Sequence, residues 1–117
     1  MSATHGNNLS FALVEARTTT GVGEKVQLNG PKHSFQITGT TSSGAGAAVV
    51  VIEVTAKESP TLTAGSTDWL TAGTATLTLS TTSAAEGFNI DANWRWVRWR
   101  VASISGTGAA INVYMGN

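Results

Sequence analysis

Hydrophobic and polar residues alternate with a period of two along much of this chain. The clearest examples are residues 33–38, 74–80 and 110–115, where apolar side chains take every second position between threonine, serine, glutamine or asparagine. Successive side chains of a β-strand point to opposite faces, so this alternation is typical of strands with one buried face. No segment shows a convincing helical pattern, and we expect essentially no helix.

The pattern divides the chain into eight or nine short strands separated by turn-forming residues. Regular short strands of this kind predict an all-β, single-domain β-sandwich with antiparallel strands, and a jelly-roll-like arrangement is our first choice. We expect a flexible N-terminal arm over residues 1–8 and one sandwich domain over residues 9–117. The expected strands are residues 9–15, 24–28, 33–38, 48–55, 74–80, 87–90, 93–104 and 110–115.

The segments between these strands carry three further expectations. Residues 39–47 are rich in glycine, serine and threonine, which predicts a flexible connection. Residues 58–67 contain proline and glycine and predict a loop, whereas residues 105–108 (Ser-Gly-Thr-Gly) predict a tight hairpin connection. Within residues 48–55 we expect burial on both faces except at Glu53.

The segment 93–104 is the most distinctive, because it holds three of the four tryptophans and three of the seven basic residues. Read as a strand, it places Val97, Trp99 and Val101 on one face and Trp96, Arg98 and Arg100 on the other. The first set suits a core. The second set could be displayed to a partner.

Our candidate partner interface therefore comprises Trp94, Trp96, Arg98 and Arg100. Tryptophan and arginine are enriched at the centres of protein interfaces, and they can also stack with and donate hydrogen bonds to a sugar or a base. A structural alternative stays open. In it the tryptophans cover a sheet edge or lie under a loop, and the arginines pair with Glu53, Glu86 or Asp91. Trp69 is expected to be a plug in the hydrophobic core rather than a ligand platform.

Composition removes several classes of chemistry. The chain has no cysteine, and its two histidines, His5 and His33, are far apart and show no metal-binding spacing. The acidic residues are scattered, and no nucleophile motif is present. We therefore expect no catalytic residues, no metal, no cofactor and no enzymatic activity.

The charge balance points to protein partners. Net charge is zero, only 12% of residues are charged, and close to half are threonine, serine, alanine or glycine. A nucleic-acid binder would carry a basic excess, and no apolar run is long enough for a membrane helix, so neither partner is expected. A neutral surface favours self-association. The first ten residues lack the features of an export signal, which predicts that the protein is made and used without conventional export.

Several stretches resemble small virion structural proteins of tailed bacteriophages. They are VQLNGPKHSFQITGTTSSGAGAAVVVIEV, DWLTAGTATLTLS and EGFNIDANWRWVRWRVASISGTGAAINVYMGN, which together span most of residues 26–116. The resemblance implies a non-catalytic capsid decoration or cement protein in the virion, assembled in the host cytoplasm. It also implies contacts with the major capsid protein or other virion proteins and a homo-oligomer, dimer or trimer. A tail or baseplate location stays open.

A second resemblance is to discoidin-like, galactose-binding-type jelly rolls. It rests on the aromatic-Val-Arg pattern of residues 96–101 and on Asp68-Trp69 after a polar loop. This resemblance implies an alternative function, a carbohydrate-binding module that takes a glycan as ligand. The chain is shorter than most such modules and lacks their disulfide, which counts against that alternative.

Overall fold

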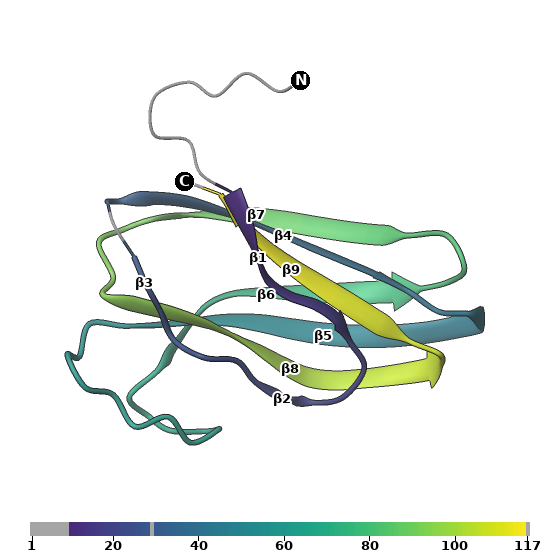
Figure 1. The fold of residues 1–117 in the computed structure, drawn as a ribbon, viewed down its shortest axis with the longest axis horizontal. Helices are drawn as coiled ribbons and strands as arrows, with labels where there is room; N and C mark the ends of the chain where they lie inside the picture. Colours follow the sequence, from purple (N-terminus) through teal and green to yellow (C-terminus); the bar gives the residue numbers. More distant parts are fainter. Residues whose placement is uncertain (1–9, 29, 117) are drawn as a thin grey trace.

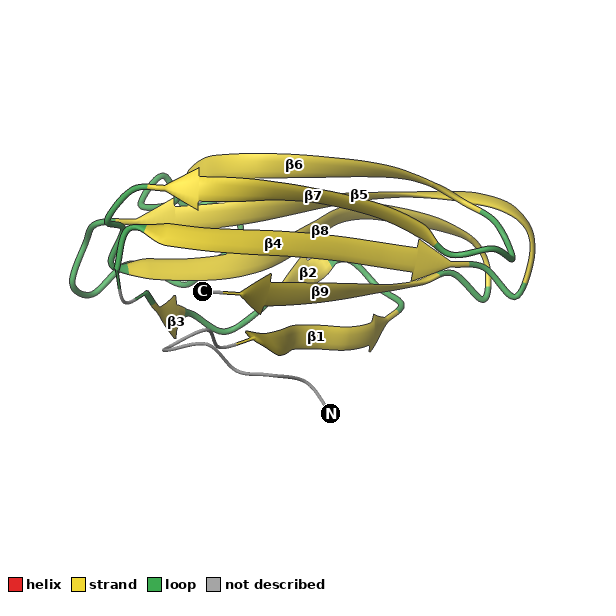
Figure 2. Cartoon of the chain, turned by 90° about the horizontal axis from the view of Figure 1, so that it is seen from above, coloured by secondary structure: helices red, strands yellow, loops and turns green. Residues whose placement is uncertain are grey.

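The computed structural model describes residues 10–28 and 30–116, which form two antiparallel β-sheets packed face to face (Figures 1 and 2). None of the described residues is helical, so this part of the chain contains no helix that could cross a membrane. The arm expected over residues 1–8 lies outside the described residues. The strands are β1 (Ser10–Arg17), β2 (Gly21–Val22), β3 (Val26–Gln27), β4 (Lys32–Thr40), β5 (Ser43–Thr55), β6 (Leu70–Leu79), β7 (Ala84–Asp91), β8 (Trp96–Thr107) and β9 (Ala110–Gly116).

The topology is that of a jelly roll, which confirms the predicted fold class. One sheet has the order β1-β9-β4-β7; the other has the order β2-β8-β5-β6, with β3 also paired to β8. If β2 and β3 are counted as one interrupted strand, the pairs run from the ends of the chain inwards: β1 with β9, β2 and β3 with β8, β4 with β7, and β5 with β6. The chain is thus one long antiparallel hairpin wrapped around a core, and the wrapping adds the β4–β9 and β5–β8 pairs.

The core lies between the sheets and is built from the alternating positions that the sequence indicated. Phe35 and Ile37 of β4 are almost completely buried, and so are the alanine and leucines at every second position of β6. The ring of Phe88 from β7 stacks on Phe35 and also lies directly over Gly73 of β6, where a Cβ atom would be 2.4 Å from the ring. A glycine at this position lets the two sheets approach at their β6–β7 edge. Inward positions of β8 and β9 are buried as expected.

Two expected connections are different in the structure. Residues 39–47 are not a flexible connection, because β4 continues to Thr40 and β5 already begins at Ser43. The small residues here serve close strand packing: a Cβ atom on Gly46 would lie 2.3 Å from the carbonyl oxygen of Ser105 on β8. Residues 105–108 do not form a hairpin, because β8 and β9 belong to different sheets and the turn carries the chain across the sandwich.

Candidate functional site

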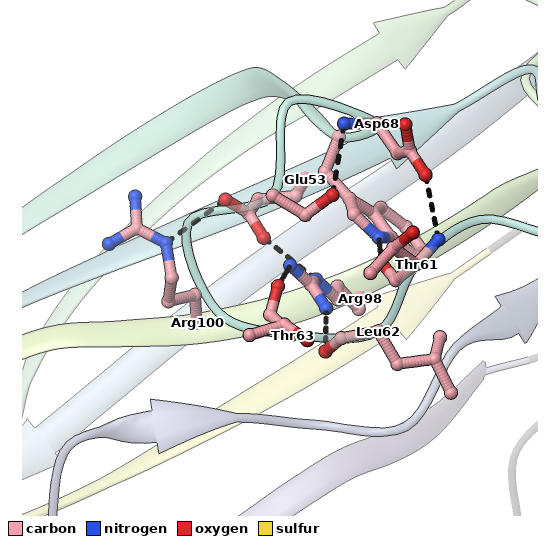
Figure 3. Close-up of polar contacts among 9 residues, drawn as sticks. Glu53, Thr61, Leu62, Thr63, Asp68, Arg98 and Arg100 are labelled. Atoms are coloured by element: carbon pink, nitrogen blue, oxygen red, sulfur yellow. Dashed lines mark hydrogen bonds and ion pairs between the residues drawn. The ribbon is translucent and has the colours of Figure 1, made fainter.

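The connection between β5 and β6, residues 56–69, lies over the outer face of the sheet that contains β8 (Figure 3). This is the loop that the proline and glycine of residues 58–67 predicted. Long loops that pack against their own domain are frequently functional. A cluster of charged side chains from β5 and β8 holds the loop on the sheet. Glu53 of β5 and Arg98 of β8 are opposite each other in the strand register, so their side chains lie side by side.

Arg98 is the centre of this cluster, and only 1% of it is exposed. Its Nε donates to Oε1 of Glu53 (2.8 Å), while its terminal nitrogens donate to the loop carbonyl oxygens of Leu62 (2.8 Å) and Thr63 (3.3 Å). The guanidinium also lies over the Trp69 ring, 4.3 Å from its centroid. A buried charge is tolerated when it is paired and its donors are satisfied, and a guanidinium offers five donors in a fixed geometry. Arg98 thus ties the loop to the sheet.

Glu53 serves two arginines at once. Its Oε2 accepts a hydrogen bond from Nε of Arg100 at 3.0 Å, while its Oε1 accepts from Arg98. The expectation that Glu53 is the exposed position of its strand is wrong: the residue is only 6% exposed, because the two guanidiniums and the loop cover it. One carboxylate and two guanidiniums leave the cluster with a net positive charge. The Arg100 side chain is 30% exposed, so this charge is accessible to solvent.

The loop is also fastened to itself near its end. The indole N–H of Trp69 donates to the Thr61 carbonyl oxygen (2.8 Å), and the Asp68 carboxylate accepts from the Thr61 amide (2.8 Å) and from Lys57 Nζ (2.6 Å). The hydrogen bond with Lys57, followed by those with Thr61, lowers the pKa of Asp68 to about 2. Trp69 is buried, but the expected position in the core is wrong: the ring lies under the loop against Arg98 and not between the two sheets.

Trp96 and Trp94 lie at the end of the same sheet and are partly exposed. The indole N–H of Trp96 donates to the Glu58 carbonyl oxygen (3.2 Å), and the Lys25 ammonium is 4.2 Å from the centroid of its ring. Trp94 precedes β8 and packs against the edge of the core. These two residues stay accessible to a partner.

The structure therefore separates the four residues expected at one interface. Trp96, Arg98 and Arg100 lie outside the core, but Arg98 does not lie on the accessible surface, because the loop covers it. Both arginines pair with Glu53, and neither pairs with Glu86 or Asp91. The sequence signal for this cluster was a single acid in an apolar strand and two arginines at alternate positions of another strand. Which strands become neighbours was not visible.

No described group of three or more histidine, aspartate or glutamate side chains could hold a metal ion. His33 is buried at the start of β4, with its Nε2 2.9 Å from the carbonyl oxygen of Gly30. His5 lies outside the described residues. The charged groups around Arg98 form their hydrogen bonds with other groups of this protein. Their role is therefore structural: they hold the loop on the sheet.

Comparisons with known proteins give one informative result. No family model and no curated protein matches this sequence. Among solved structures, the chain is similar to the crystal structure of the SPBc2 prophage-derived protein YomS, with a TM-score of 0.56 and 20% sequence identity. The similarity covers 100% of this chain and 99% of the YomS chain. At this identity the likeness shows a shared fold, and the two proteins share it over their full lengths.

Proposed function

We propose that this protein is a non-catalytic structural component of a bacteriophage virion. The observation that carries the proposal is the fold shared with a prophage-derived protein, which covers 100% of this chain and 99% of that chain. Fold alone does not fix function. The composition supports the same conclusion, because a chain with zero net charge and few charged residues is suited to having much of its surface covered by other protein.

The more specific role we propose is that of a capsid decoration protein that acts on the head shell, with the major capsid protein as partner. Such a protein binds the assembled shell and not its free subunits, so it stabilises the particle by mass action. We place Trp94, Trp96 and Arg100 in the contact, and we assign Arg98 the task of holding the loop that borders it. A dimer or trimer would present several copies of this contact at once.

The test uses particles of the phage or prophage whose genome encodes this chain. Mass spectrometry of purified particles should detect the protein at a fixed copy number, and immunogold labelling should place it on the head. Particles made without it should bind added protein to saturation and release their DNA at a higher temperature afterwards. Immunogold labelling on the tail would contradict the decoration role and favour a tail or baseplate role. Absence from the particles would overturn the virion proposal.

Trp96→Ala is the variant that tests the contact, and Thr78→Ala, on the outer face of β6, is its matched control. Trp96→Ala should weaken binding to the shell about tenfold or more, as expected for an interface tryptophan, while the subunit stays folded. Thr78→Ala should bind like the natural protein. The glycan-binding alternative is examined on the same protein: saturable quenching of tryptophan fluorescence by simple glycans would favour it over the virion role.

A further inference from the structure

The open side of the sandwich, between the edge strand β1 and the edge formed by β2 and β3, contains a cleft of ≈ 420 Å³. Its apolar wall comes from Leu13 of β1 and from Val22 and Val26, and the Trp99 ring lines it as well. A second hollow of ≈ 410 Å³ lies on the other side of residues 22–25, towards Leu62, whose side chain is among the most exposed large hydrophobic ones described. None of these residues was identified from the sequence as part of a site.

Trp99 contributes a polar group that the fold leaves unused. The residue is 94% buried, yet its indole N–H makes no hydrogen bond with any described residue, whereas the indole N–H groups of Trp69 and Trp96 both do. Every fully buried side-chain nitrogen or oxygen in the described part of the chain has a partner. Nε1 of Trp99 must therefore reach an accessible position, and the cleft is the hollow that this ring lines. A largely buried donor without an acceptor is costly unless a ligand or water satisfies it.

Gly23 is what permits this arrangement. A Cβ atom at this position would lie 2.0 Å from Nε1 of Trp99, so only a glycine can pass so close to the indole. The glycine amide donates to the Trp99 carbonyl oxygen, which fixes the segment over the ring. The following residues, Glu24 and Lys25, form no main-chain hydrogen bonds within the described structure. Unpaired main-chain groups therefore border the cleft on a sheet edge.

These features select one class of ligand. An extended peptide can bond to free main-chain groups at a sheet edge, and an aliphatic side chain fits walls of leucine and valine. A sugar is less suitable, because sugars bind by stacking on an open aromatic face and the Arg17 guanidinium already lies over the Trp99 ring, 5.1 Å from its centroid. The rim carries Glu24 beside Lys25, so charges of opposite sign are adjacent and a neutral segment is favoured.

We propose that this cleft binds an extended, neutral peptide segment of another protein, with an aliphatic side chain between Leu13 and the two valines. A carbonyl oxygen of the segment accepts the free indole hydrogen of Trp99. The proposal rests on the proposed virion role only for the identity of the partner. The cleft itself can be tested on the isolated protein.

The experiment follows the indole N–H resonances of the ¹⁵N-labelled protein by NMR, with Trp99→Phe to assign the relevant peak. If that variant does not fold, the assignment comes from triple-resonance spectra of the natural protein. The probes are pools of capped pentapeptides with a fixed central residue and mixed neutral flanks. Pools with central valine, leucine or isoleucine should shift the Trp99 peak in a saturable manner. Pools with central serine, glutamate or lysine should bind about tenfold more weakly, because they leave the apolar wall uncovered.

Leu13→Ser should weaken binding of the aliphatic pools at least about fivefold, whereas the matched control Thr78→Ser should leave it unchanged. The proposal is overturned if no pool moves the Trp99 resonance, if the aliphatic and serine pools act alike, or if methyl glycosides shift this peak and the peptides do not. Peptide binding by a protein absent from particles would support the cleft and contradict the virion role. Incorporation into particles without peptide binding would support the virion role and contradict the proposed function of the cleft.

Discussion

The two outer faces of the sandwich are treated in opposite ways. The outer face of the sheet with β5 and β8 carries the charged residues Glu53, Arg98 and Arg100 and is covered by residues 56–69. The other outer face, over β4, β7 and β9, displays short neutral polar side chains at its centre, and Ser34 and Gln36 there are exposed. The first face thus uses most of its charge to hold its own loop, and only Arg100 keeps part of its charged side chain exposed, whereas the centre of the second face displays neutral polar side chains.

The hydrogen bonds of the two faces differ in kind. On the uncovered face, Asn112 of β9 donates to Thr38 Oγ1 at 3.0 Å and accepts from the Ala16 amide at 2.8 Å, which are neutral bonds near water. On the covered face, charged groups are bonded out of reach of water, where each lost partner leaves an uncompensated charge. Substitutions should therefore have very different effects on the two faces.

Arg98→Ala should have the largest effect. It leaves the Glu53 carboxylate with one partner and frees the carbonyl oxygens of Leu62 and Thr63, so we expect the free energy of unfolding to fall by about 3–5 kcal/mol. Urea titration followed by circular dichroism measures this change. The double variant Glu53→Leu, Arg98→Met should recover much of the loss, because well-packed apolar residues can replace a buried ion pair. If Arg98→Ala lowers the free energy of unfolding by less than about 1 kcal/mol, the Glu53–Arg98 ion pair contributes no more than a weak surface pair.

Trp69→Phe should have a smaller effect, about 0.5–1.5 kcal/mol, because it removes one hydrogen bond to the Thr61 carbonyl oxygen and keeps an aromatic ring under Arg98. The same urea titration applies. Trp94→Phe is the matched control, since the Trp94 indole makes no hydrogen bond with the described residues and should lose less. Equal losses for both variants would show that the bond to Thr61 does not hold the loop.

The loop should also respond to acid through Asp68. Its pKa is lowered from 3.8 to about 2 in the folded protein, so its stabilising contribution is present above about pH 4 and is lost as the pH falls towards 2. We expect the fluorescence of Trp69 to change over this range before the sheets unfold, as judged by far-ultraviolet circular dichroism. In Asp68→Asn this separate step should be absent. Its persistence in that variant would assign the transition to another carboxylate.

Gln36→Ala, on the uncovered face, should have the smallest effect. The side chain is exposed, and substitutions at such positions usually change stability by no more than about 0.5 kcal/mol. Urea titration alongside Arg98→Ala gives a direct comparison of the two faces. A loss above about 1.5 kcal/mol would show that the uncovered face is itself closed by contact with another copy, and light scattering would then report an oligomer for the natural protein and a smaller species for the variant.

Local chemistry explains which parts of this arrangement could be predicted. Alternation predicted the inward positions of β4, β6, β8 and β9, because the side-chain period of a strand depends only on the backbone. It could not show that Ser105-Gly106-Thr107-Gly108 joins two sheets, since a tight turn fits either a hairpin or a crossing. The burial of Arg98 also escaped prediction. It depends on a loop returning over β8 from 36 positions earlier in the chain.

The cleft beside Trp99 was beyond prediction for a related reason. Its walls come from β1 and from residues 22–26, which meet only when the wrapped hairpin closes. Gly23 could be recognised in the sequence as a turn residue, but its approach to an indole nitrogen depends on the pairing of β2 and β3 with β8. Sequence patterns describe neighbours along the chain well, and neighbours across the sandwich poorly.

The pairing of β1 with β9 has a consequence for synthesis on the ribosome. β9 fills the place between β1 and β4, so the first sheet has a gap until residues 110–116 have been made and exposed. Contacts between residues so distant in sequence form slowly, and an incomplete sheet presents unpaired edges. Elongation at about 5–20 residues per second gives neighbouring nascent chains time to meet at those edges. The first sheet can therefore be completed only after its last strand has been synthesised and exposed.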